Sequence, residues 1–169
     1  MKLTSLFILI FILVGCGYKP SSYYAKQELN SKVYIDTTID IKNSEGSILT
    51  KDIINNIVLG KFNSIIVDEK SKADFLLLVY LQNVDTKSLQ TDDQGYVLVK
   101  RVTVSINVEY RKNITHSQKT IITTTSYSDY LVSDDSIITE KNKVYAITNA
   151  VSKSLSNIFS KIAIENFRK

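Results

Sequence analysis

The chain has 169 residues, of which 44% are hydrophobic and 22% charged, as in an ordinary globular domain with a modest core. Lys and Arg number 21 against 17 Asp and Glu, which gives a formal net charge of +4. This mild excess comes without a basic block or an RNA-binding motif, so we expect no nucleic-acid partner.

A short apolar run follows Lys2 and ends at Cys16, the only cysteine. At about 1.5 Å per residue, residues 6–14 cover ~14 Å of a bilayer core that is about 30 Å thick, too little for a membrane span. A positive start, a short apolar core and a small residue before the cut are the parts of a secretory signal. The sequence Leu13-Val14-Gly15-Cys16 therefore predicts a lipoprotein cleavage site.

This site divides the chain into a signal peptide (1–15), a lipidated tether (16–31) and one domain (32–169). A diacylglycerol and an N-acyl chain on Cys16 would hold the domain on a membrane and explain a lone thiol in an exported protein. No other cofactor is expected. Gly17, in place of Asp, favours sorting to the outer membrane. Removal of Lys2 with the signal lowers the formal charge of +4 by one.

The first predicted elements are a strand at Lys32–Asp36, a turn at Asn43–Gly46 and a helix from about Ser47 to Phe62. In the helix, apolar residues recur every fourth position from Leu49. Ser47 is a suitable N-cap, and Gly60 lies where the helix would end.

The middle of the chain predicts three strands. The apolar run Ala73–Leu81 suits a buried helix or a central strand, and its length and its β-branched and aromatic flanks favour the strand. After a polar loop at Ser88–Gly95, apolar residues alternate with polar ones over Arg101–Tyr110, which predicts a strand with one buried face. Thr120–Tyr130 is its expected antiparallel partner.

The last element is a long helix with one apolar stripe at Val144, Ile147, Val151, Leu155, Ile158 and Ile162. The order β-α-β-β-β-α predicts an α+β two-layer sandwich, in which two helices cover one face of an about four-stranded mixed sheet. The strand-helix-strand crossover allows its two strands to lie parallel. The outer face would present Arg101, Thr103, Ser105 and Glu109 to water or to a partner.

These elements resemble the LptE family of lipopolysaccharide-assembly lipoproteins. The mature start Cys16-Gly17-Tyr18-Lys19-Pro20 is similar to the family's start, Cys-Gly and an aromatic residue. The order of the elements is also similar to that of the family: a strand at Val33–Ile35, strands that begin at Ala73-Asp74-Phe75 and at Gly95-Tyr96, and a long terminal helix. The resemblance spans the whole mature chain, although each motif is short.

The resemblance implies a non-enzymatic, lipid-anchored protein of the Gram-negative outer membrane. It would lie on the periplasmic side or within the lumen of the β-barrel protein LptD, help LptD to assemble, and serve lipopolysaccharide transport to the cell surface. A larger barrel encloses a polar interior. Such an interior suits the polar side of the last helix, which carries Thr148, Asn149, Ser152, Ser156, Asn157 and Ser160.

Some family members have basic residues for lipopolysaccharide contact in the loop between the second and third strands and before the last helix. This chain has Asp92-Asp93 and Asp134-Asp135 there, so these stretches are not assigned as such a site. If an anionic glycolipid binds directly, the better candidates are the cations near those loops: Lys87, Lys100, Arg101, Lys141 and Lys143. The alternative is that these are scattered solubilising charges.

Catalysis and metal binding have little support in the sequence. His116 is the only histidine, it is expected in a hairpin turn, and spacing predicts no partner for it. The Asp pairs lack the ligand spacing of a calcium loop, and no phosphate-binding loop occurs. Two other non-enzymatic interpretations remain: an auxiliary lipoprotein of an ABC-type lipid transport system, and a surface lipoprotein with an apolar ligand pocket, of which the sequence gives no sign.

Overall fold

The computed structural model describes residue 23 and residues 31–38, 44–62, 64–114 and 117–167. The elements are β1 (Lys32–Thr38), α3 (Ser44–Phe62), β2 (Ile65–Ile66), the short 3-10 helix η2 (Lys70–Lys72), β3 (Phe75–Thr91), β4 (Val97–Lys112), β5 (Thr120–Leu131) and α4 (Ser136–Phe167). The predicted signal peptide and nearly all of the tether lie outside the described residues.

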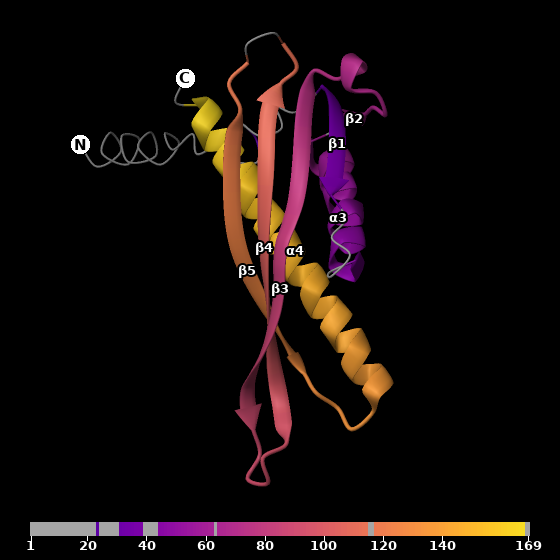
Figure 1. The fold of residues 1–169 in the computed structure, drawn as a ribbon, viewed down its shortest axis with the longest axis vertical. Helices are drawn as coiled ribbons and strands as arrows, with labels where there is room; N and C mark the ends of the chain where they lie inside the picture. Colours follow the sequence, from indigo (N-terminus) through magenta and orange to yellow (C-terminus); the bar gives the residue numbers. More distant parts are fainter. Residues whose placement is uncertain (1–22, 24–30, 39–43, 63, 115–116, 168–169) are drawn as a thin grey trace, which may run out of the picture.

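The strands form one mixed sheet in the order β2-β1-β3-β4-β5. β1 is parallel to β2 and to β3, whereas β3, β4 and β5 are antiparallel. Both helices lie on the same side of the sheet, with α3 near β1 and α4 crossing obliquely behind β4 and β5 (Figure 1). The predicted α+β two-layer sandwich and its parallel crossover are therefore confirmed.

A fifth strand, β2, differs from the expected order. It pairs with the first residues of β1, Lys32 with Ile65 and Val33 with Ile66. The backbone N–H of Ile65 donates to the carbonyl of Ser31 (3.0 Å), and that of Val67 donates to the carbonyl of Val33 (3.0 Å). Two residues are too few to produce an alternating pattern, which is why periodicity could not reveal this strand.

The hairpin between β3 and β4 is longer than the sequence suggested, and the predicted loop at Ser88–Gly95 is wrong in its extent. Strand β3 continues to Thr91, and only residues 92–96 separate it from β4. The Asp92 carboxylate closes this turn by accepting hydrogen bonds from the N–H groups of Gln94 (2.9 Å) and Tyr96 (2.8 Å). Gly95 has a φ of 89°, a conformation that glycine adopts without strain.

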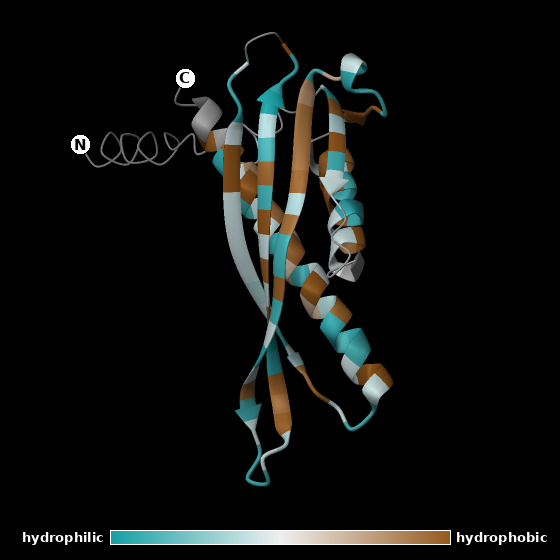
Figure 2. Cartoon of the chain, viewed as in Figure 1, coloured by the Kyte–Doolittle hydropathy of each residue, from teal (hydrophilic) through white to brown (hydrophobic). Residues whose placement is uncertain are grey.

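The core lies between the sheet and the helices. Along β4 every second residue from Val102 to Tyr110 is buried, as the alternation predicted, and Figure 2 shows the brown and teal bands of this strand. From α4, Ile147, Val151, Leu155, Ile158 and Ile162 are buried against it, and Val144 is only half-buried. The helical stripe was thus predicted correctly except at its N-terminal end.

The starts of the two helices have different local causes. Asp135 caps α4, because its Oδ1 accepts hydrogen bonds from the N–H groups of Ile137 (2.7 Å) and Ile138 (3.3 Å). Helix α3 begins at Ser44, before the expected N-cap, and Ser47 is buried inside it. Gly46 lets α3 approach β3, since a Cβ there would lie 3.0 Å from Leu81 Cδ2.

Candidate functional site

The face of the sheet opposite the helices, here called the open face, presents short polar side chains. Asn107 on β4 pairs with Thr123 on β5, and the next row brings Ser105 beside Thr125. The hydroxyls of Ser105 and Thr125 lie 2.9 Å apart and share a hydrogen bond. In Figure 2, β5 is pale over much of its length, in keeping with its Thr and Ser content. This face suits contact with a hydrated surface rather than burial against an apolar layer.

Three cations of the open face lie beside carboxylates. Arg101 pairs with Asp129, Lys119 lies 3.5 Å from Glu109, and Lys87 lies 4.0 Å from Asp85. Each of these three cations thus has a carboxylate beside it. Such pairing weakens the attraction of the face for a polyanion and leaves it polar without a strong net charge.

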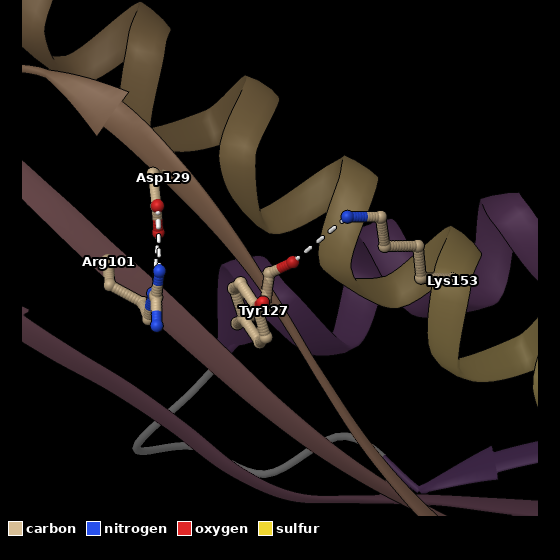
Figure 3. A network of polar contacts seen from close by, with 4 residues as sticks. All are labelled: Arg101, Tyr127, Asp129 and Lys153. Atoms are coloured by element: carbon tan, nitrogen blue, oxygen red, sulfur yellow. Dashed lines mark hydrogen bonds and ion pairs between the residues drawn. The ribbon is translucent and has the colours of Figure 1, made fainter.

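A polar cluster joins β4 to β5 (Figure 3). Arg101 donates from Nε to Asp129 Oδ1 (2.6 Å) and from an Nη to Oδ2 (2.9 Å), a bidentate arrangement. Its guanidinium also lies over the ring of Tyr127, 4.0 Å from the ring centre. The hydrogen bonds from Arg101 lower the pKa of Asp129, and the hydrogen bonds to Asp129 raise the pKa of Arg101.

Lys153 links this cluster to α4. From the helix, its ammonium reaches the edge of β5 and lies 3.4 Å from the carbonyl oxygen of Tyr127, as the dashed line in Figure 3 shows. Beside it is a hollow of about 360 Å³ lined by Ser128, Asn149, Ser152, Lys153, Ser156 and Asn157. Four of the residues expected on the polar side of the last helix therefore line this hollow together.

The five cations predicted as glycolipid contacts do not form one site. Lys87 and Arg101 are cross-strand partners on the open face, whereas Lys100 pairs with Ser88 and Tyr130 on the helix side. All three lie within strands and not at their ends. Lys141 and Lys143 belong to α4, and Lys143 is 2.8 Å from Glu140. Arg101 and Lys143 are thus already engaged by carboxylates.

A second hollow of about 680 Å³ lies along the first three turns of α4. Ile137, Val144 and Tyr145 give it an apolar floor, and Ser136, Glu140, Lys141 and Thr148 complete the described lining. Ile137 and Tyr145 are largely exposed, at 65% and 69%. The hollow lies on the helix surface and not between sheet and helices, where an enclosed ligand pocket would be expected.

Other predicted positions are not described. Cys16 and His116 lie outside the described residues, so the lipidation site stays a prediction from sequence. Among the residues that are described, no cluster of three or more His, Cys, Asp or Glu side chains could hold a metal ion. Within the same residues, no helix combines the length and the apolar character needed to cross a bilayer.

Comparison with known proteins relates the architecture to bacterial lipoproteins. No known protein family matches the sequence, and no curated protein matches it significantly. The fold is similar to that of rare lipoprotein B. That protein, from Shewanella oneidensis, is 14% identical, with 81% of this chain and 97% of that chain covered and a TM-score of 0.54. A candidate lipoprotein from Caulobacter crescentus is 12% identical, with 86% and 97% covered and a TM-score of 0.56. At these identities, the likeness establishes a shared fold.

Sequence reasoning missed the cluster of Asp129, Tyr127 and Lys153. Its members come from β5 and α4, and they meet Arg101 only because the register places Arg101 opposite Asp129. The alternation of β5 put Tyr127 and Asp129 on one face, which was a usable signal. The turn between β4 and β5 sets the register, however, and its length could not be read reliably from the sequence.

Proposed function

We propose that this chain is a non-enzymatic outer-membrane lipoprotein, anchored through Cys16, that occupies the lumen of the LptD β-barrel and helps it assemble for lipopolysaccharide transport. The observation that carries the proposal is the fold shared with rare lipoprotein B, on a chain whose sequence predicts a lipoprotein signal. The order of the short LptE-like motifs adds to it.

The surface of the domain suits this role. A polar lumen accepts a rigid domain whose exposed surfaces keep their hydrogen bonds to water or exchange them for polar wall groups. The open face has Ser, Thr and Asn rows and compensated charges, and α4 presents Asn149, Ser152 and Asn157 beside Lys153. A surface of this kind carries function by contact and needs no catalytic group.

The test is affinity isolation of the full lipoprotein from membranes in mild detergent. We expect a large outer-membrane barrel protein to be recovered in stoichiometric amount. Recovery of an ATPase or a permease instead would support the auxiliary lipoprotein of an ABC-type system and contradict the barrel proposal. Recovery of neither would also contradict it.

The anchor is tested separately by Cys16→Ala. The variant should not incorporate labelled palmitate and should leave the membrane fraction. The melting temperature of its domain should stay unchanged, because 15 residues separate Cys16 from the start of β1 at Lys32. Continued labelling would show that the lipid is not attached at Cys16.

A further inference from the structure

Strand β5 is an edge of the sheet, and the direction of its backbone groups can be read from its neighbours. Val132 N–H donates to the Leu98 carbonyl on β4 (2.9 Å), so this residue faces the sheet. The Leu131 carbonyl instead accepts from Asn142 of α4 (3.0 Å), and the Tyr127 carbonyl lies 3.4 Å from Lys153 Nζ. Because both backbone groups of a residue point the same way and successive residues alternate, the odd-numbered residues of β5 face outward.

Helix α4 passes behind β5, where Thr124 donates to the carbonyl of Ser154 (3.0 Å), but its side chains reach the outward backbone groups of this edge at only one end. Asn142 and Lys153 occupy the outward carbonyls of Leu131 and Tyr127, whereas the outward N–H and C=O groups of Ile121, Thr123 and Thr125 have no partner among the described residues. The pairing of β4 with β5 has no register shift, and β5 contains no Pro, Lys or Arg. Natural edge strands ordinarily carry such protection, and an edge without it is a template for another strand.

We propose that β5 pairs antiparallel with β5 of a second copy of this chain. A two-fold axis at Thr124 brings outward residues opposite one another: Ile121 faces Tyr127 of the other copy, and Thr123 faces Thr125. The symmetry repeats both pairs, which yields about eight backbone hydrogen bonds. The ten strands of the two copies then form one continuous sheet.

The side chains on the open face favour a second copy over a foreign strand. In this register Ile121, 53% exposed, packs across from Tyr127, 52% exposed, and an aromatic ring beside a β-branched side chain is a favourable cross-strand pair. Just outside these pairs, Lys119 faces Asp129 of the other copy. Lys119 and Asp129 already have the partners Glu109 and Arg101 within each copy, so the self-complementarity of this edge lies in its apolar and hydroxyl pairs, and the charges at its ends are of opposite sign. The hydrogen bond from Lys153 to the Tyr127 carbonyl is long, at 3.4 Å, so a backbone N–H of the second copy can replace it.

The expected dimer is weak in dilute solution. A single strand pair buries less than the about 1,200 Å² of a standard stable interface. Confinement to a membrane surface raises the effective concentration of a tethered chain, so pairing is expected there first. This inference goes beyond the proposed function. It requires only that two copies of the chain come into contact while no other protein is bound to the edge of β5.

The test uses two differently tagged full chains, Thr123→Cys and Thr125→Cys, produced together with their signal sequence in a bacterial host above the level of any partner. Directly opposed residues have Cα atoms about 5.5 Å apart, within disulfide range. The mixed disulfide should form at least tenfold more than Thr123→Cys homodimers, whose cysteines are diagonal. Ile65→Cys on the opposite edge, which is also exposed, is the matched control and should not cross-link to Thr125→Cys.

Ile121→Pro, introduced into both copies, checks that backbone pairing is responsible. It removes an outward N–H and no hydrogen bond of the monomer, so the disulfide yield should fall at least fivefold while the melting temperature is retained. Equal yields for opposed and diagonal cysteines, no disulfide at all, or adducts only with another protein would each overturn the proposal. The outcome does not depend on recovery of a barrel protein, which tests the proposed function alone.

Discussion

Replacement of Asp135 by Ala removes the N-cap of α4. Its Oδ1 accepts hydrogen bonds from the N–H groups of Ile137 (2.7 Å) and Ile138 (3.3 Å), and both donors would otherwise depend on water. Loss of an Asp cap costs about 1 kcal/mol of unfolding free energy. For a domain of this size that free energy corresponds to a melting temperature lower by about 2–4 °C. Circular dichroism of the full chain in mild detergent measures this change.

Two variants make this prediction specific to capping. Asp135→Asn keeps an oxygen acceptor and should lose no more than a few tenths of a kcal/mol. Asp134→Ala removes the same charge one residue earlier, where no hydrogen bond links the side chain to the described residues, and should change stability by less than about 0.5 kcal/mol. Equal losses for Asp134→Ala and Asp135→Ala would show that charge and not capping is responsible, and the reasoning would be refuted.

Other predictions concern the Arg101 pair and two glycines. The hydrogen bonds from Arg101 lower the pKa of Asp129 from its ordinary value of 3.8. The ionised Asp129 therefore stabilises the fold above pH 3.8, and this stabilisation is lost as the pH falls through the lower pKa of the folded state. Asp129→Asn should reduce the acid-induced fall in melting temperature below about pH 4. Gly46→Val should destabilise the domain by about 1–3 kcal/mol in urea unfolding, because its Cβ would meet Leu81 at 3.0 Å. Gly60→Ala meets nothing within 4 Å and should instead stabilise α3 by up to about 1 kcal/mol; a loss would contradict the open surroundings of this position.

Most of the architecture could be predicted from the sequence, because the spacing of apolar residues in a long strand or helix shows which face is buried. The alternation from Val102 to Tyr110 and the helical stripe from Ile147 to Ile162 both depend only on local spacing, and both are buried as expected. The β-α-β crossover followed from element order and the known handedness of such connections.

The parts that sequence could not supply depend on register or on contacts between distant residues. The bidentate pair of Arg101 and Asp129 requires the exact pairing of β4 with β5. Likewise, Asp92 and Asp135 stood out as acidic residues at positions where the family resemblance implied basic ones. The structure gives each a local role, closing a turn and capping a helix, that spacing alone did not distinguish from a surface charge.

Helix α4 follows all the strands that the structure describes, and it supplies much of the cover over the buried side of β4 and β5. During synthesis from the N-terminus, those strands therefore emerge before the helix that shields them. Val102, Val104, Ile106 and Val108 stay uncovered until the segment through Ile162 has followed. A chain that stops after β5 would present this apolar surface permanently, so stop codons late in the gene should yield aggregation or proteolysis rather than a shortened working domain.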